Sequence, residues 1–366
     1  MSHRGVSDFK IGEIMKLEKT YAIHVLVMFY EIEMFKDWIN GIENMVEDIE
    51  NPENITLHID YSLRQDFERI DYAALPEGGY LITEYMKQIE KLMDLKVKVN
   101  DYVLSDGHAD EQKYIEEPMS IARARRDFNY KYATKVDYLM WGETDSFFPK
   151  ETFQVLERIA LYSIATKAYR YVVSFGYRKM WDSGWAVLEH PEFVHETFED
   201  TDEWNLHNKA SEKCYMSIKE MNKINKKHLE HDFDIISLSE PKFDGSCVVF
   251  TSDLVKSGVN IPHALLMSGE DTSFAHTAKK ILGDNYTQFH IANLLRVHNR
   301  RHPEKRNYIV GEDNKMGFCG EKDKGRWWKI LEHFSKENLY HLNDPTFKFH
   351  TWQEYFTSMI QQGFLK

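Results

Sequence analysis

The spacing of apolar residues changes repeatedly along the chain, and it predicts strands and helices in alternation. Continuous or alternating apolar runs predict strands at 20–30, 55–62, 96–104, 138–141, 169–181 and from 247. Apolar positions three and four residues apart predict helices at 33–49, 80–95, 120–133, 153–164 and 274–282. A strand–helix–strand start is the βαβ unit of a parallel sheet, so this pattern predicts an α/β fold.

Polar stretches interrupt this α/β region, and an aromatic-rich stretch follows it. Residues 63–79, which include Gly78-Gly79, are polar and predict a loop, and residues 182–212 are acidic and irregular. Many aromatic residues between 319 and 366 predict a helical C-terminal region that packs on the core. We therefore expect one domain over residues 1–310, followed by a helical extension over residues 311–366.

Two carboxylates follow the apolar run at 138–141, which stops at Gly142. Glu143 and Asp145 stand one residue apart, and helical spacing resumes shortly afterwards. The pair therefore follows the carboxyl end of a strand, the edge at which open α/β sheets bind ligands. Carboxylate oxygens at this spacing suit a divalent cation such as Mn²⁺ or Mg²⁺. The alternative is a helix entry, in which Asp145 or Ser146 caps the helix and Glu143 is solvated.

This acidic loop resembles the DxD metal signature of GT-A glycosyltransferases, in particular the inverting family 2 type, with Glu143 in place of the first aspartate. Other parts of the family pattern recur in order over roughly residues 20–300. The resemblance implies a GT-A fold, which is a Rossmann-like, mostly parallel sheet flanked by helices. It also implies a histidine that joins the metal after the acceptor helix, and His298 is the candidate.

The resemblance further implies where a UDP-sugar donor would bind. Asp60 matches the acid that contacts uracil at the end of the second strand, with an ordinary turn aspartate as the alternative. Residues on the helix before the acidic loop, and arginines after the acceptor helix, match groups that face the donor and its diphosphate. These candidates are Arg123, Arg126, Asn129, Arg296, Arg300 and Arg301. Guanidinium groups suit phosphate oxygens, although surface charge or pairing with the chain's own acids explains the same residues.

A second acidic pair, Glu270-Asp271, follows Gly269 and precedes a helical run. It resembles the E-D motif of family 2 enzymes, in which the aspartate is the general base. An alcohol is a poor nucleophile at neutral pH, and a positioned carboxylate can remove its proton as the new bond forms. Asp271 matches this base, and Glu270 is the neighbour that can exchange roles with it. A capping box formed by Ser268 and Asp271 is the competing interpretation.

The composition bears on which partners the protein binds and in which compartment it acts. The chain has 366 residues, 42% of them hydrophobic, and a formal net charge of −13, which argues against a general polyanion binder. Cys214, Cys247 and Cys319 are too far apart to indicate a disulfide framework or a zinc site. No apolar run approaches the roughly 20 residues of a membrane span, and residues 1–19 lack the apolar core of a secretory signal. We therefore expect a cytoplasmic protein.

The function that these features predict is metal-dependent transfer of a sugar from a nucleoside diphosphate sugar to an acceptor hydroxyl, with inversion. The acceptor is a saccharide, a protein hydroxyl or a modified DNA base. Basic residues in 219–227 and 296–306 would suit DNA, as in phage enzymes that glycosylate hydroxymethylcytosine. A solvated helix face and a donor site explain the same basic residues without DNA.

Two other functions remain open. A nucleotidyltransferase also uses paired acids, but it calls for a glycine-rich phosphate loop near the first strand, and VLVMFYEIEMF contains no glycine. A binding module without catalysis would use these acids only as helix caps.

Overall fold

The structure is a computed structural model of the chain. It describes residues 13–28, 31–62, 78–104, 121–178, 183–195, 216–230, 232–238, 242–266, 269–299 and 332–362. The predicted site residues Arg300 and Arg301, residue Ser268 of the alternative capping box, and the predicted domain boundary near 310 lie outside these residues.

An eight-stranded sheet in the order β3-β2-β1-β4-β8-β6-β9-β7 forms the centre of the fold. Its strands are β1 (Tyr21–Met28), β2 (Ile55–Ser62), β3 (Lys98–Leu104), β4 (Tyr138–Gly142), β6 (Tyr171–Gly176), β7 (Ile235–Leu238), β8 (Cys247–Thr251) and β9 (Thr287–Leu295). Only β8 and β7 run antiparallel to their neighbours among these strands. The expected α/β fold with a mostly parallel sheet is therefore confirmed.

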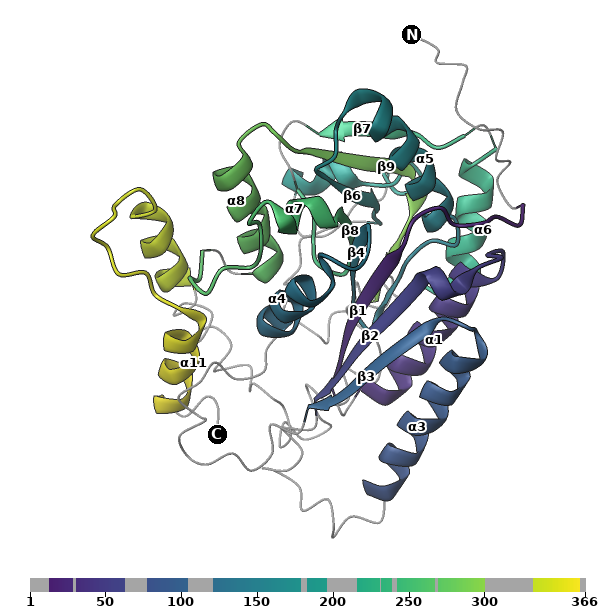
Figure 1. Ribbon diagram of the computed structural model, residues 1–366, viewed down its shortest axis with the longest axis horizontal. Helices are drawn as coiled ribbons and strands as arrows, with labels where there is room; N and C mark the ends of the chain where they lie inside the picture. The colour runs from purple at the N-terminus through teal and green to yellow at the C-terminus, as the bar shows by residue number, and fades with distance from the viewer. Residues whose placement is uncertain are drawn as a thin grey trace.

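Helices cover both faces of this sheet (Figure 1). The helices are α1 (Ile32–Val46), α3 (Gly78–Asp94), α4 (Ile121–Tyr132), α5 (Thr152–Thr166), α6 (Ile218–His228), α7 (Ser252–Lys256), α8 (Glu270–Leu282) and α11 (Trp352–Gln361), with a further helix at 332–340. Short 3-10 turns lie at Pro52–Asn54 and Ser183–Leu188. Among the described residues, we find no helix with the length and apolar character that crossing a membrane requires.

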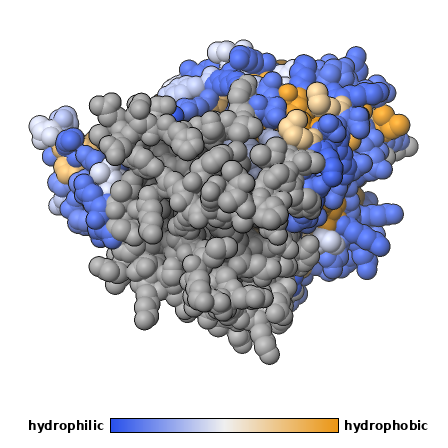
Figure 2. Space-filling view, turned by 90° about the horizontal axis from the view of Figure 1, so that it is seen from below, coloured by the Kyte–Doolittle hydropathy of each residue, from blue (hydrophilic) through white to orange (hydrophobic). Residues whose placement is uncertain are grey.

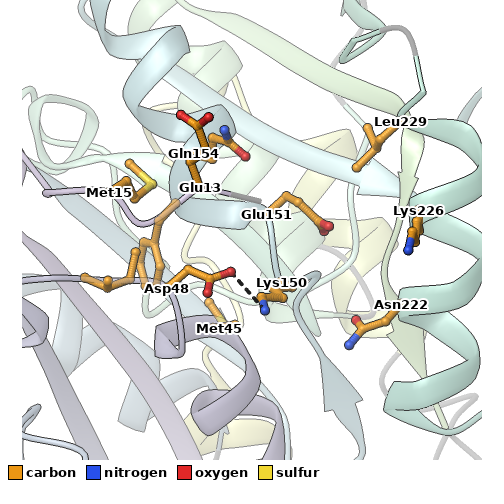
Figure 3. A pocket seen from close by; sticks show the side chains of 12 residues that line it. Glu13, Met15, Met45, Asp48, Lys150, Glu151, Gln154, Asn222, Lys226 and Leu229 are labelled. Carbon is orange, nitrogen blue, oxygen red and sulfur yellow. Dashed lines mark ion pairs between the residues drawn. The ribbon is translucent and has the colours of Figure 1, made fainter. Parts of the chain in front are cut away.

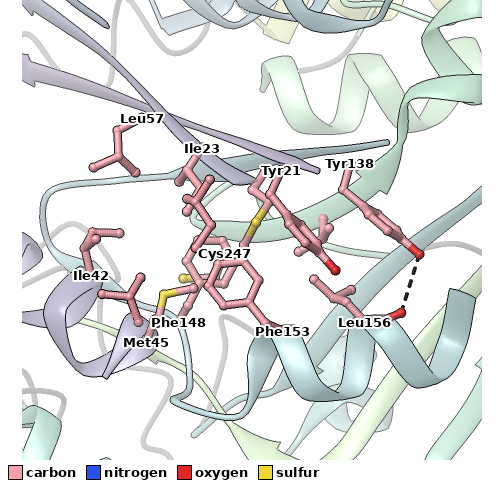
Figure 4. Close-up of a cluster of buried hydrophobic side chains, with 14 of the residues drawn as sticks. Tyr21, Ile23, Ile42, Met45, Leu57, Tyr138, Phe148, Phe153, Leu156 and Cys247 are labelled. Carbon is pink, nitrogen blue, oxygen red and sulfur yellow. Dashed lines mark hydrogen bonds between the residues drawn. The ribbon is translucent and has the colours of Figure 1, made fainter. Parts of the chain in front are cut away.

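Alternation along β1 and β4 explains the two covered faces. Tyr21 and Ile23 of β1 join a core cluster with α1, α3 and α5 (Figure 4), whereas Ala22 joins a second cluster with α4, α7 and α8. Tyr138 and Leu139 of β4 divide in the same way. Successive side chains of a strand point to opposite faces, so strands that are apolar throughout bury both faces.

The C-terminal part of the chain packs on the second of these clusters. Trp352 and Tyr355 of α11 belong to it, and the Leu265 N–H donates to the His350 carbonyl at 3.0 Å. These contacts bury Trp352 and Tyr355 against the core. The described surface seen in Figure 2 is mostly hydrophilic, with hydrophobic side chains at several separate places.

The structure differs from the sequence prediction in two places. Gly78 and Gly79, predicted to lie in a loop, begin α3. Strands β7 and β9 were not predicted: β7 is four residues long and largely exposed, and β9 carries buried polar residues that break its apolar run. Two of them have a partner inside the sheet, the Ser174 hydroxyl of β6: His290 lies 3.0 Å from it, and Gln288 donates to it at 2.7 Å.

Candidate functional site

The acidic loop after β4 meets the loop before β8 at one edge of the sheet. Because β8 is antiparallel to β4, Gly142 at the end of β4 pairs with Cys247 at the start of β8. The Ser146 hydroxyl lies 2.7 Å from the Ser246 carbonyl and 2.9 Å from the Glu143 carbonyl, and its single hydrogen is shared between these two acceptors. The two loops are thereby held together at the carboxyl end of β4.

A short antiparallel pair brings the chain back to this loop from β9. Strand β5 (Ser146–Phe147) pairs with β10 (Val297–His298), and this register sets His298 opposite Ser146. The Asn299 N–H donates to the Asp145 carbonyl at 2.7 Å and extends the connection by one residue. The predicted histidine therefore faces the acidic loop, although about 150 residues separate them in sequence.

Glu143, Asp145 and His298 form a cluster whose candidate ligand atoms all lie within 4.8 Å of one another. His298 Nε2 lies 3.2 Å from Glu143 Oε2 and 3.6 Å from Asp145 Oδ1. Burial would lower the pKa of His298, but the carboxylates around it raise that pKa above its ordinary value. Two carboxylates and one imidazole are a donor set that fits a divalent cation such as Mn²⁺.

The alternative helix entry for the acidic loop is wrong. Helix α5 begins at Thr152, with Glu151 at its N-cap, so neither Asp145 nor Ser146 caps it. Asp145 is 1% exposed, and the Ser146 hydroxyl bonds within and between the loops. Ser146 therefore stabilises the loop, and Asp145 belongs to the carboxylate cluster.

Arg125 of α4 links this cluster to the second acidic pair. Its side chain is fully buried, and it lies over the Trp141 ring at 5.0 Å. One guanidinium nitrogen, Nη2, donates to Glu143 Oε1 at 3.1 Å and to the Gly245 carbonyl at 2.7 Å, while Nη1 donates to Glu270 Oε1. Since Arg125 occupies Oε1 of Glu143, it leaves Oε2 on the side of His298.

Gly245 allows this approach because it has no side chain. A Cβ at this position would overlap Nη1 of Arg125 and lie 3.2 Å from Glu270 Oε1. The Gly245 N–H donates to Asp271 Oδ2 at 2.9 Å, and the Thr272 N–H donates to Asp271 Oδ1 at 2.6 Å. Gly245 therefore bonds to both parts of the site. Its carbonyl accepts from Arg125, and its N–H holds Oδ2 of Asp271 in place.

The two members of the second acidic pair are in different electrostatic situations. Burial raises the pKa of Glu270, although Arg125 opposes that rise. Burial, together with the neighbouring carboxylates of Glu270 and Asp244, raises the pKa of Asp271 to about 7. Glu270 is paired with a guanidinium group, whereas Asp271 is held by backbone N–H groups. Of the two, Asp271 has the protonation equilibrium that suits a base near neutral pH.

The N-cap of α8 differs from the one that the competing capping box requires. Helix α8 begins at Glu270, and its N-cap is Gly269, which has no side chain to cap with. A box between Ser268 and Asp271 would place Ser268 at the N-cap. The pair therefore lies in the first turn of α8.

Several residues predicted to face the donor are used inside the protein instead. Arg126 donates to the carbonyls of Ile261 and Pro262, and the Asn129 side chain bonds to Asn260 and Trp141. Arg123 lies on the outer side of α4 and pairs with Asp127 at 3.9 Å. The hydrogen bonds of Arg126 and Asn129 disfavour the predicted donor roles of these two residues, because donors that bond inside the protein are not available to a ligand.

Arg296 is also bonded inside the protein. It is 2% exposed, donates to Asp244 and Ser246, and lies over the Tyr177 ring at 3.7 Å. These partners disfavour its predicted contact with a diphosphate and make it part of the support beneath the site.

Asp60 is buried near the end of β2, and its carboxylate faces two histidines. His24 Nε2 is 3.0 Å from its Oδ2, and His58 Nε2 is 3.3 Å from its Oδ1. Burial alone would raise the pKa of Asp60, but the two histidines hold it well below its ordinary value. Asp60 is therefore an ionised acceptor at neutral pH, and its contact with uracil stays a prediction.

Sequence reasoning missed Arg125, Asp244, Gly245 and Ser246. Arg125 was not among the candidate residues on its helix, and the Asp-Gly-Ser run before β8 had not been considered. The available signal was that run itself, because an aspartate before a glycine next to a buried strand is typical of a tight, side-chain-bonded turn.

A pocket of about 600 Å³ lies elsewhere, between α1, α5 and α6 (Figure 3). Its described lining carries both charges, including Glu13, Glu151, Lys150 and Lys226. Lys150 is already paired with Glu47 at 2.6 Å and with Asp48 at 2.9 Å. The lining shares no residue with the carboxylate cluster among the residues that the structure describes, so the cluster and this pocket are separate features.

Comparisons with known proteins add little to this geometry. No protein-family model and no curated protein sequence matches the chain. Among solved structures, the crystal structure of S. aureus TarS 1–349 is similar, with a TM-score of 0.40 and 10% sequence identity over 94% of this chain and 92% of that chain. A likeness this weak carries no argument about function, so the fold and the site rest on the strand order and contacts described above.

We predict that Arg125→Gln destabilises the protein by about 3–5 kcal/mol, because it removes a fully buried guanidinium group from two partly buried carboxylates. Arg123→Gln on the same helix is the matched control, and it should change stability by less than about 0.5 kcal/mol. Urea unfolding of both variants measures the difference. Equal stabilities for the two variants would show that Arg125 is not holding the site together.

Proposed function

We propose that the protein is a metal-dependent glycosyltransferase that moves a sugar from a UDP-sugar to an acceptor hydroxyl. The observation that carries the proposal is the connection between the two acidic groups. Arg125 spans from Glu143 of the cluster to Glu270 of the α8 pair, and Gly245 bonds to both Arg125 and Asp271. Sugar transfer calls for both groups, one for the diphosphate and one for the acceptor.

The donor end of the reaction is assigned to Glu143, Asp145 and His298. A divalent cation bound there would supply positive charge for the leaving diphosphate. The protein's own contribution is to fix these three ligands, through the β5·β10 register and the Ser146 hydroxyl. Both devices act on backbone positions, so the ligand positions depend on the fold and not on exposed side chains.

The acceptor end is assigned to Asp271. A carboxylate with a pKa near 7 is both substantially ionised at neutral pH and basic enough to accept a proton from a hydroxyl. The N–H groups of Gly245 and Thr272 orient its two oxygens. Direct attack by the acceptor oxygen, assisted by this base, displaces the diphosphate from the opposite face and inverts the anomeric centre.

The contacts do not favour DNA over another acceptor. Arg296, one of the residues expected to hold a phosphate backbone, is buried on Asp244. On α6, Lys227 is paired with Glu192 at 2.7 Å, and Lys226 lines the separate pocket. The proposal therefore specifies a hydroxyl acceptor and leaves a modified DNA base as one of the candidates that an acceptor screen would include.

Isothermal titration with UDP tests the donor end. The wild-type protein should bind UDP more tightly with Mn²⁺ than without it, and Asp145→Asn should remove most of that difference because a ligand is lost. Asp253→Asn on α7 makes the same charge change at the opposite end of β8 and should behave as wild type. Metal-independent UDP binding would contradict the proposal, and turnover of a nucleoside triphosphate would favour a nucleotidyltransferase.

Asp271→Asn tests the acceptor end. We expect it to retain UDP binding and to lower the transfer rate by roughly 10²–10⁴, the usual contribution of a positioned base. For the wild type, kcat/KM should rise with pH through about 7 and then level off, because the base acts only when it is deprotonated. The variant should lack that rise.

The control for this base is Asp284→Asn, which changes an exposed carboxylate just after α8. Its rate and pH profile should match those of the wild type. An Asp271→Asn variant that kept full specific activity would assign the proton transfer to another group.

A further inference from the structure

We propose that Asp244 is a positioning residue, which orients the imidazole of His298 so that its Nε2 atom is presented to a divalent cation. The inference rests on the proposed metal site and adds to it a fourth side chain, which does not itself touch the cation. It assigns a function to the Asp-Gly-Ser turn before β8.

The position of His298 between two sets of carboxylates suggests this role. Its Nε2 faces Glu143 and Asp145, at 3.2 and 3.6 Å, and its Nδ1 faces Asp244 Oδ2 at 3.8 Å. The two nitrogens of an imidazole point away from each other, so the ring spans from the cluster to Asp244. A histidine that binds a metal through one nitrogen typically donates the N–H of the other to a carboxylate, carbonyl or water.

Asp244 is held firmly enough to direct a neighbouring ring. It is 3% exposed, and its Oδ1 accepts hydrogen bonds from the Ser246 N–H at 3.0 Å and the Ser246 hydroxyl at 2.6 Å. Its Oδ2, the oxygen that faces His298, also accepts from Arg296. Both oxygens are thereby fixed in direction before any ligand binds.

The support continues into the metal loop itself. The Ser246 carbonyl accepts the hydrogen bond from Ser146, which follows Asp145 directly in the chain. Arg296 is fixed from behind by the Tyr177 ring at 3.7 Å. Asp244 and the carboxylates of the cluster therefore share one rigid frame, and His298 lies between the two parts of that frame.

The chemistry requires a particular tautomer. A neutral imidazole binds a cation through the nitrogen that carries no proton, so binding through Nε2 places the proton on Nδ1. The carboxylate of Asp244 is the acceptor for that Nδ1–H. The present 3.8 Å separation is longer than a hydrogen bond, and we expect the ring to shift toward Asp244 when Nε2 binds a cation.

A purely structural role is the competing explanation, in which Asp244 only neutralises buried Arg296. The position of Oδ2 is compatible with both explanations, because this oxygen faces His298 and also accepts from Arg296. A double-mutant cycle separates the two explanations, because an interaction through His298 disappears when His298 is removed.

The experiment measures the dissociation constant of Mn²⁺ without donor, from the electron paramagnetic resonance signal of free Mn²⁺. Wild type, Asp244→Asn, His298→Ala and the double variant are compared, with Asp253→Asn as the control for the charge change. We expect Asp244→Asn to raise the constant roughly 10–100-fold, as loss of such a partner usually does. In the His298→Ala background the same change should have less than about a twofold effect, because Asp244 would have nothing left to orient.

Thermal unfolding without metal identifies the folded variants. If Asp244→Asn fails to fold, Asp244→Glu replaces it in both backgrounds, and if His298→Ala fails to fold, His298→Gln replaces it. Equal effects of Asp244→Asn in both backgrounds would overturn the inference, and so would an effect below about twofold in the wild-type background. Either result leaves the proposed function standing as long as the wild type binds Mn²⁺. A wild type that binds no Mn²⁺ contradicts the proposed function as well.

Discussion

The candidate site depends on the ion pairs that the buried guanidinium group of Arg125 makes with Glu143 and Glu270. The chain carries a net charge of −13, and at one edge of its sheet it gathers Glu143, Asp145, Asp244 and the α8 pair. Buried carboxylates at short range repel one another and are costly to desolvate. Arg125 offsets part of that cost on one side of the site, and Arg296 does so on the other through Asp244.

The strand order explains why these groups meet. The antiparallel β8 beside β4 makes the turn before β8 a neighbour of the loop after β4, and the β5·β10 pair returns the chain to the same place. Gly245 lets Arg125 pass close to the backbone on its way to Glu270. The site is therefore assembled from α4, β4, the β8 turn, α8 and β10, and each element contributes one or two polar groups.

The local spacing of apolar and polar residues was sufficient to predict individual strands and helices and the places of the two acidic pairs. Strand β2 was predicted at its observed limits, and the acidic loop and the α8 pair were found from their place between a strand or loop and a helix. Local spacing could not predict the side-chain contacts that connect these elements. Arg125 meets Glu270 across 145 positions, and Arg296 meets Asp244 across 52, so nothing near either arginine shows which of them is buried. Strand β9 was missed for a related reason, since its buried polar residues find partners only in the folded sheet.

The central claim is that Glu143, Asp145 and His298 bind a cation that contacts the diphosphate of a UDP donor. A crystal structure of the protein with UDP and Mn²⁺ tests it most directly. The account predicts an anomalous manganese peak between these three side chains and the two phosphates, with Asp271 facing the space beside the donor. Manganese at another place, or UDP bound away from this edge of the sheet, would contradict it.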